Sequence, residues 1–182
     1  RIVEQATPHQ LIVDVGARGI ERSNSYDLMS KWGWRGLLFE ANPALITQLQ
    51  QDFNGLNCEI VNTAVSDYNG QAEFHIGIND DVSSLSEENA ASWGASRGKV
   101  TVNVRRLGDL LAERVIPADF DVLSLDIEGV DIKVLNDLID NTPYRPRWII
   151  IEASYDFATK SLDDRPFSDA VRRHYTICGL TS

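Results

Sequence analysis

Carboxylate side chains stand at the ends of several short apolar runs in this chain, and the first of these runs ends in a glycine. The acidic residues are Asp14, Glu40, Asp126, Glu128 and Glu152, and the glycine is Gly16. A glycine just past a strand lets the backbone pass close to a ligand, because no Cβ is in the way. A carboxylate at the end of the following strand can accept hydrogen bonds from the two hydroxyl groups of a ribose. These residue types indicate a site for a nucleoside-containing ligand.

The spacing between Asp14 and Glu40 supports this interpretation. Glu40 follows Asp14 by 26 residues, close to the roughly 20 residues expected in nucleotide-binding βαβ units. Dinucleotide-binding units hold a pyrophosphate with the pattern G-x-G-x-x-G, but Ala17 and Arg18 follow Gly16 here. An acid at position 14 suits a cationic ligand that carries an amino acid better than it suits a diphosphate. S-adenosylmethionine is such a ligand.

The later carboxylates have the chemistry to activate a hydroxyl group as methyl acceptor. Methyl transfer is an in-line displacement, so the attacking oxygen must be aligned with the methyl group and must lose its proton. Among Asp126, Glu128, Asp131 and Glu152, one can act as a general base, or two or three can bind a Mg²⁺ ion that holds the hydroxyl. Structural roles compete with both routes. Glu128 can cap the following helix or bind backbone N–H groups in the turn, Asp131 can be the N-terminal acid of that helix, and Glu152 can be a plain strand-end carboxylate.

Strands and helices alternate along the chain and would bring these residues to one edge of a sheet. Buried strands are predicted over residues 11–16, 37–40, 58–61, 120–126 and 147–152, with a last strand over 175–178. Helices are predicted over residues 26–32, from Asn42 as N-cap and Pro43 through Leu45, Leu49 and Phe53, over 107–114, through Ile132, Leu135, Leu138 and Ile139, and over 169–173. This α/β order predicts a mostly parallel sheet with helices on both faces. Ligands bind beyond the carboxyl ends of such strands.

The middle of the chain interrupts the alternation. Residues 72–76 and 100–104 have the period-2 pattern of half-exposed strands, so an antiparallel hairpin is predicted as an insertion over about residues 71–105. The polar stretch 80–98, with Ser83, Ser84 and Trp93, is predicted to be a lid or a wall of the acceptor site. His75 and His174 are further candidate bases, but we expect both to be ordinary surface or packing residues.

Several motifs together resemble the FkbM-type methyltransferases in order and spacing. They are DVGA at 14–17, FEANP at 39–43, NTAVSD at 62–67 with Gly70, the pair Ser83-Ser84, and LDIEGVD at 125–131 with Leu135. The resemblance runs from about Leu11 to Glu152, and its most specific part is the D-x-E-G-x-[DE] stretch that follows F-E-x-N-P. It implies a Rossmann-like class I methyltransferase fold. The usual reaction of that family is O-methylation of a sugar, a polyketide or another small-molecule hydroxyl.

The resemblance also implies roles for individual residues. Cofactor contacts are implied for Asp14, Gly16 and Ala17 at the methionine part, Glu40 and Ala41 at the ribose, Thr63 and Ala64 at the adenine, and Asp126 nearest the transferred methyl group. Asp126, Glu128 and Glu152 are the candidate catalytic residues. The chain departs from the family's usual D-V-G-A-N-x-G, because Arg18 stands at the Asn position and Gly19 comes one residue early. We expect Arg18 to face solvent, with contact to Glu40 or a substrate carboxylate as the alternative.

Composition limits the class of protein and its partners. The 182 residues suit a single domain over 1–182, and the net charge of -10 without a basic run argues against a nucleic-acid partner. No apolar run approaches the roughly 18 residues of a membrane span. The two cysteines have no metal-binding spacing and are predicted to be buried thiols in a reducing, cytoplasmic protein. The chain ends soon after its sixth predicted strand, where this fold commonly adds a seventh, which leaves a truncated C-terminus open.

Three functions follow from the sequence. The leading hypothesis is an S-adenosylmethionine-dependent enzyme that methylates a hydroxyl of a small molecule or glycan, with Mg²⁺ as an open second cofactor. A nicotinamide dinucleotide-binding oxidoreductase has the same fold, but the missing second glycine speaks against it. A non-catalytic methyltransferase-like binding module is the third, because the turn Arg18-Gly19-Ile20 is altered.

Overall fold

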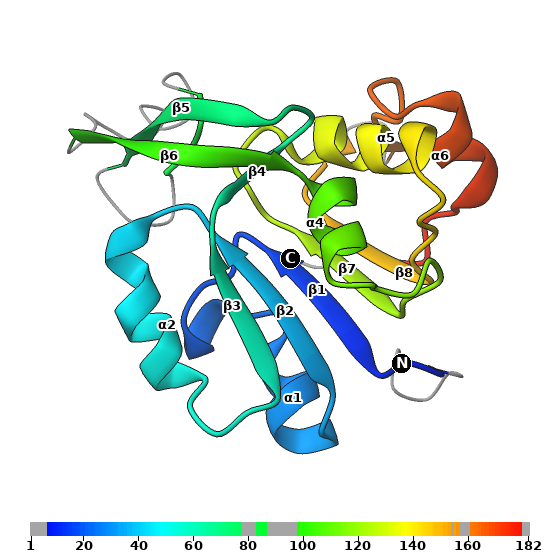
Figure 1. The fold of residues 1–182 in the computed structure, drawn as a ribbon. Coiled ribbons are helices and arrows are strands. Elements are labelled where there is room, and N and C mark those ends of the chain that lie inside the picture. Colours follow the sequence, from blue (N-terminus) through cyan, green and yellow to red (C-terminus); the bar gives the residue numbers. More distant parts are fainter. Residues whose placement is uncertain (1–6, 78–82, 87–97, 154, 157–160, 180–182) are drawn as a thin grey trace.

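The computed structural model describes residues 7–77, 83–86, 98–153, 155–156 and 161–179. At its centre is a five-stranded parallel sheet with the strand order β3-β2-β1-β7-β8. The strands are β1 (Leu11–Val15), β2 (Arg35–Glu40), β3 (Cys58–Asn62), β7 (Val122–Leu125) and β8 (Trp148–Ile151). The order reverses at β1, with β2 and β3 on one side and β7 and β8 on the other (Figure 1). This is the parallel sheet that the alternation predicts.

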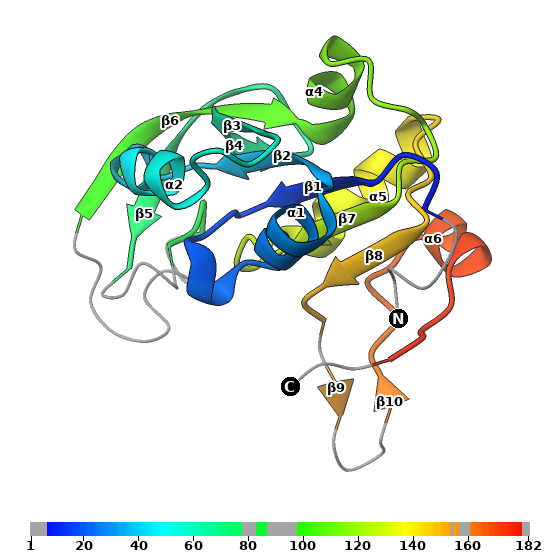
Figure 2. The same cartoon turned by 90° about the horizontal axis from the view of Figure 1, so that it is seen from below.

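Helices cover both faces of the sheet, as predicted. On one face lie α1 (Tyr26–Trp32) and α2 (Ile46–Asp52), where Ile12 of β1 packs in one cluster with Met29 and Leu49. On the other face lie α4 (Leu107–Glu113), α5 (Asp131–Asn141) and α6 (Asp169–His174), where Val13 of β1 packs in one cluster with Leu135. Neighbouring residues of a strand point to opposite faces, which divides Ile12 and Val13 between the two clusters. Figures 1 and 2 show α1 and α5 on opposite sides of the sheet.

The segment after β2 begins with a tighter turn than the sequence predicts. Asn42 is the N-cap, and its side-chain oxygen accepts a hydrogen bond from the Ala44 N–H at 3.0 Å. The first turn, η3 (Pro43–Leu45), is a 3₁₀ helix that leads into α2. Of the predicted apolar face, Leu49 and Phe53 are buried. A second 3₁₀ turn, η2 (Ile20–Arg22), follows β1 and was not predicted.

The insertion forms a separate three-stranded sheet of order β4-β6-β5. The predicted hairpin is confirmed, because β5 (Gly70–Ile76) and β6 (Gly98–Arg106) are antiparallel, with Ala72 opposite Val102. The parallel pairing of β4 (Ala64–Ser66) with β6 was not predicted. Most of the predicted loop at 80–98, including Trp93, lies outside the described residues. Within it, Ser84 pairs with His75 in an isolated antiparallel bridge.

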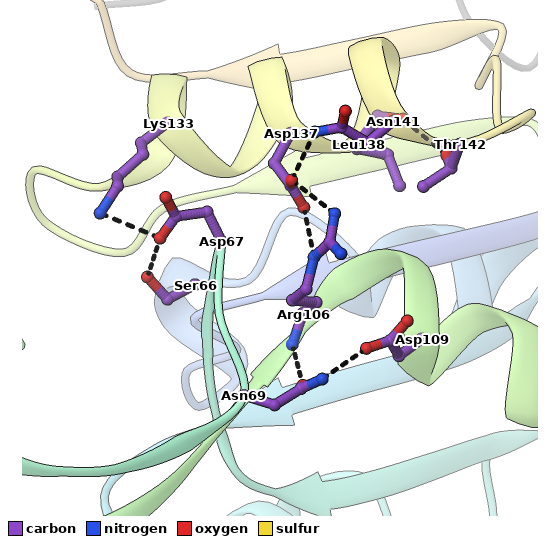
Figure 3. Close-up of polar contacts among 10 residues, drawn as sticks. All are labelled: Ser66, Asp67, Asn69, Arg106, Asp109, Lys133, Asp137, Leu138, Asn141 and Thr142. Carbon is purple, nitrogen blue, oxygen red and sulfur yellow. Dashed lines mark hydrogen bonds and ion pairs between the residues drawn. The ribbon is translucent and has the colours of Figure 1, made fainter.

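Polar contacts join the inserted sheet to α5 (Figure 3). Arg106, at the end of β6, donates two hydrogen bonds to the Asp137 carboxylate, at 3.1 and 2.7 Å. The Lys133 ammonium lies 2.9 Å from the carboxylate of Asp67 in the turn after β4. In that turn Asn69 accepts a hydrogen bond from the Arg106 N–H at 2.8 Å. These contacts tie α5 to the end of β6 and to the turn after β4, next to the site described below.

The C-terminal segment differs from the prediction. Residues 175–178 are not a strand, and their side chains are mostly exposed, with Ile177 63% accessible. An apolar alternation becomes a strand only where a neighbour pairs its backbone groups, and no described strand lies beside this segment. Instead, Tyr175 donates its hydroxyl hydrogen to the Pro146 carbonyl at 3.0 Å. The short pair β9 (Tyr155–Asp156) and β10 (Ser161–Leu162) follows β8 and was not predicted.

Two further expectations concern the cysteines and the membrane. Both cysteines are free thiols, as predicted, but neither is fully buried, since Cys58 is half-buried and Cys178 is exposed. Among the described residues, no helix has the length and apolar character needed to cross a membrane.

Candidate functional site

An open pocket lies at the carboxyl ends of β1, β2 and β7, against part of the inserted sheet. Its wall combines strand ends, the turns that follow them and residues of the insertion. The lining residues are Val15, Gly16, Arg18, Phe39, Glu40, Ala41, Thr63, Ala64, Val65, Phe74, Ser83, Leu85, Asp126, Ile127, Glu128 and Val130. This is the edge of the sheet where parallel α/β folds bind their ligands. Seven of the sequence-predicted site residues meet here: Gly16, Glu40, Ala41, Thr63, Ala64, Asp126 and Glu128.

The turn after β1 needs glycine at position 16 because another part of the protein packs against it. Its φ is +85°, and a Cβ placed on it would lie 1.9 Å from the carbonyl oxygen of Asp126. The Gly16 N–H donates to the Phe39 carbonyl at 2.9 Å, and the Asp126 N–H donates to the Val15 carbonyl at 3.0 Å. From the sequence, a close approach of this glycine to a ligand is expected. The structure shows a close approach to the neighbouring strand's turn, which brings Asp126 to the pocket.

Asp14 and Ala17 lie behind the pocket wall, although the sequence analysis assigned both to cofactor contact. Asp14 is 3% exposed and Ala17 is 1% exposed. Asp14 is on a central strand, where its carboxylate accepts a hydrogen bond from the Ser25 hydroxyl at 2.6 Å. Burial raises the pKa of Asp14, while hydrogen bonds from Ser25 and Ser124 act in the opposite direction. Asp14 thus holds the segment before α1 against the sheet.

Glu40 lies at the end of β2 and is 6% exposed. One carboxylate oxygen accepts a hydrogen bond from the Asn42 N–H at 2.6 Å, which fixes the side chain through the turn that begins η3. The Glu40 carbonyl accepts from the Thr63 N–H at 3.1 Å, so the ends of β2 and β3 are tied together. Thr63 in turn donates its hydroxyl to the Asn103 carbonyl of β6 at 3.0 Å. A buried, oriented carboxylate therefore stands beside Thr63 in the wall.

The turn between β7 and α5 supplies the other acidic side of the pocket. Glu128 has a φ of +52°, a left-handed conformation that costs a residue with a side chain about 1–2 kcal/mol. Its carbonyl accepts a hydrogen bond from the Ser84 hydroxyl at 2.8 Å. The Asp131 carboxylate accepts from the N–H groups of Ile127 and Gly129, at 2.9 and 3.0 Å. The helix-start role that the sequence left open for Asp131 is the one observed.

Electrostatics make Glu128 unusual within this site. Its pKa is raised to about 7, first by partial burial, then by the negative charges of Glu152 and Asp126, while Arg18 opposes the shift. Glu152, an exposed residue just past β8, is not part of the wall. Partial desolvation of its carboxyl raises the pKa of Glu152, and the negative charges of Asp126 and Asp131 raise it further. A carboxyl that titrates near neutral pH can take up a proton at the pH where enzymes work.

Arg18 contradicts the expectation that it faces solvent. It is half-buried and lines the pocket, close enough to Glu128 for its charge to lower that residue's pKa. The expectation failed because most loop arginines are exposed, whereas the turn after Gly16 directs this segment along the pocket. His75 and His174 are not in the wall, and His174 is exposed on α6.

The insertion contributes three wall residues, Phe74, Ser83 and Leu85, and of these only Phe74 lies outside the stretch that the sequence predicts to be a lid or a wall of the acceptor site. Phe74 is the one buried residue of β5. Its position in the period-2 pattern of residues 72–76 is the sequence feature that could have indicated an inward-facing side chain. Ser83 belongs to that predicted lid or wall, and it lines the pocket.

Among the residues that the structure describes, no group of three or more His, Cys, Asp or Glu side chains is arranged to hold a metal ion. The Mg²⁺ route therefore gains no support from the carboxylates around the pocket.

Comparison with known proteins assigns the chain to a family. A family model described as the methyltransferase FkbM domain matches residues 14–174. This range includes every wall residue of the pocket. No curated protein and no solved structure gives a significant match. The match does not favour the nicotinamide dinucleotide alternative. With the parallel sheet, the pocket at its carboxyl edge and this match over most of its length, the chain belongs to the FkbM methyltransferase domain family and is a methyltransferase.

Proposed function

We propose that this methyltransferase uses S-adenosylmethionine and methylates a hydroxyl group of a small molecule or glycan in the cytoplasm. One observation carries the proposal. A single pocket is lined both by Glu40, a buried carboxylate at the end of β2, and by Glu128, whose pKa is raised to about 7. The first suits a ribose, and the second suits the removal of a proton from an acceptor.

The residues around the pocket fit the parts of S-adenosylmethionine. Glu40 would present its carboxylate to the two ribose hydroxyls, and Thr63 and Ala64, which line the same pocket, would hold the adenine. The carboxylates of Asp126 and Glu128 favour a positively charged group nearby. When bound, S-adenosylmethionine supplies a methyl group on a cationic sulfur. Gly16 keeps the β1 turn packed on Asp126, so that both sides of the cofactor site stay together.

Glu128 is the proposed general base. A carboxyl with a pKa of about 7 is partly ionised at neutral pH, and it binds a proton more strongly than an ordinary glutamate does. The cofactor would supply the methyl group to the acceptor oxygen, with its sulfur leaving as a neutral thioether. The hydroxyl proton passes to the Glu128 carboxylate. Asp126 is proposed to lie nearest the transferred methyl group, and Glu152 to act through its charge on Glu128.

Binding of S-adenosylhomocysteine, measured by calorimetry, tests the cofactor half of the proposal. The wild-type protein should bind it, and Glu40→Gln should lose roughly ten- to hundredfold in affinity, because charge-assisted hydrogen bonds contribute about 1.5–3 kcal/mol. Glu59→Gln, an exposed position on the adjacent strand β3, is the matched control and should bind normally. Folded wild-type protein that does not bind would refute the proposal and favour a non-catalytic binding module.

Transfer of a labelled methyl group tests the reaction itself. Labelled S-adenosylmethionine would be incubated with a panel of hydroxylated acceptors, with and without Mg²⁺. Turnover should require Glu128 and fall by about 10²-fold or more in Glu128→Gln, the usual contribution of a general base. Glu113→Gln, at the exposed end of α4, should keep full activity. Equal turnover in the Glu128 and Glu113 variants would remove Glu128 from the proposed mechanism.

A further inference from the structure

Two residues without a role in the proposed chemistry hold the turn that carries Glu128. Ser84 comes from the insertion, and Asp131 is the first residue of α5. Ser84 is 0% exposed and Asp131 is 4% exposed, so both are fixed inside the protein. Neither lines the pocket, although Ser83 and Leu85 on either side of Ser84 do.

Ser84 reaches the turn with its hydroxyl group. The hydroxyl donates to the Glu128 carbonyl at 2.8 Å and accepts a hydrogen bond from the Ser86 N–H at 3.0 Å. Its own backbone is paired with His75 in both directions, at 2.9 and 3.0 Å. The donor is therefore anchored to strand β5 by two main-chain hydrogen bonds.

Asp131 closes the same turn from the other side. Its two carboxylate oxygens accept from the N–H groups of Ile127 and Gly129, which flank Glu128 along the chain. Glu128 and Gly129 have φ values of +52° and +102°. Two successive residues with positive φ, one of them with a side chain, persist only where the surroundings hold them.

We propose that Ser84 and Asp131 are positioning residues that hold the backbone of Glu128 in its left-handed conformation and so keep Glu128 in the pocket wall. The inference rests on the proposed function for its importance to catalysis, but the clamp itself is a property of the protein without ligands. The inserted sheet thereby helps to position the proposed base, because Ser84 is paired with β5 and donates a hydrogen bond to the turn after β7. Loss of the Ser84 hydroxyl frees the turn, and Glu128 gains contact with water.

The proposal is tested by following the ionisation of Glu128 directly. Protein labelled with carboxyl-¹³C glutamate gives a titrating signal for Glu128, identified by its absence in Glu128→Gln. Among the described residues, four charged groups act on Glu128: Arg18, Asp126, Asp131 and Glu152. Ser84→Ala is the cleaner variant because it changes none of these charges, whereas Asp131→Asn removes one. Since burial is the largest cause of the raised pKa, Ser84→Ala should lower the midpoint by about half a pH unit or more.

Ser66→Ala is the matched control. Ser66 is 2% exposed, lies on β4 of the same inserted sheet and donates one hydrogen bond, to Asp67. It should lose similar thermal stability and leave the Glu128 titration unchanged. Ser84→Cys, which keeps the size and a weaker donor, should give a smaller shift and replaces Ser84→Ala if that variant does not fold.

Two results would overturn the proposal: a folded Ser84→Ala protein with the wild-type midpoint, or an equal shift in Ser66→Ala. The titration needs neither cofactor nor acceptor, so its outcome is independent of the binding and transfer experiments. If an acceptor is found, Ser84→Ala should lower kcat and change its pH profile, while the affinity for S-adenosylhomocysteine stays within about twofold of wild type, because Ser84 is not a wall residue.

Discussion

Replacing Gly16 with alanine tests whether the contact between the β1 turn and Asp126 holds the site together. The added Cβ would lie 1.9 Å from the Asp126 carbonyl oxygen and 2.8 Å from its carbon, both backbone atoms that cannot rotate away. The φ of +85° adds a second penalty. A left-handed alanine costs about 1–2 kcal/mol, and overpacking of this kind adds about 1–3 kcal/mol. Gly16→Ala should therefore lose about 2–5 kcal/mol of unfolding free energy.

Gly55→Ala separates the two penalties. Gly55 has nearly the same φ, +82°, but no atom lies within 4 Å of the position where its Cβ would be. It should lose only the conformational part, about 1–2 kcal/mol. Urea denaturation followed by circular dichroism measures both variants against wild type, and the difference between them is the cost of the collision.

The collision also has a consequence for binding. Relief of the contact moves the β1 turn and Asp126 apart, so the affinity of folded Gly16→Ala for S-adenosylhomocysteine should fall roughly ten- to hundredfold, whereas Gly55→Ala should bind like wild type. Equal stability losses in the two variants, or normal binding by Gly16→Ala, would refute the reasoning.

Three further predictions concern single side chains. The pKa of Glu128 is about 7 in the folded protein against an ordinary 4.5, so the folded protein binds this proton more tightly than the unfolded chain does. The resulting contribution to the free energy of unfolding is fully present below about pH 4.5 and is lost as the pH rises through 7. Glu128→Gln should consequently be more stable than wild type at about pH 8, by about 1–2 kcal/mol after allowance for partial exposure, and similar near pH 4.5; a pH-independent difference in urea denaturation contradicts this. Ser25→Ala removes the 2.6 Å hydrogen bond to the buried Asp14 carboxylate and should cost about 1.5–3 kcal/mol, while Ser30→Ala, exposed on α1, should cost much less. Asn42→Ala removes the N-cap of η3 and should cost about 1 kcal/mol; an unchanged melting temperature would show that the cap does not hold this turn.

The local elements of the main sheet could be predicted because each depends on residues close together in the chain. The apolar run ending at Val15 gives β1, and Asn42 followed by Pro43 gives the capped turn after β2. Helix α1 begins at Tyr26 and ends at Trp32 as predicted, because Gly33, with a φ of +70°, terminates it. The same local signals place Glu40 and Asp126 at strand ends.

Elements that depend on a distant partner could not be predicted. The segment 175–178 has the alternation of a strand but no described neighbour to pair with. Strand β4 pairs with β6, some 40 residues later in the chain, so that Ala64 lies opposite Val104. No pattern within either segment specifies which backbone will satisfy its hydrogen bonds.

The sequence by itself determined the strands of the main sheet and the helices between them, the likeness to a methyltransferase family, and which carboxylates stand at strand ends. Those features follow from hydrophobic periodicity and turn residues, which act over a few positions. Only the tertiary structure decided that Asp14 lies behind the pocket wall, that Arg18 lies within it, and that Gly16 is needed for contact with Asp126. Each of these depends on atoms that the sheet brings together from distant parts of the chain, where burial and steric contact outweigh the local preferences of a residue.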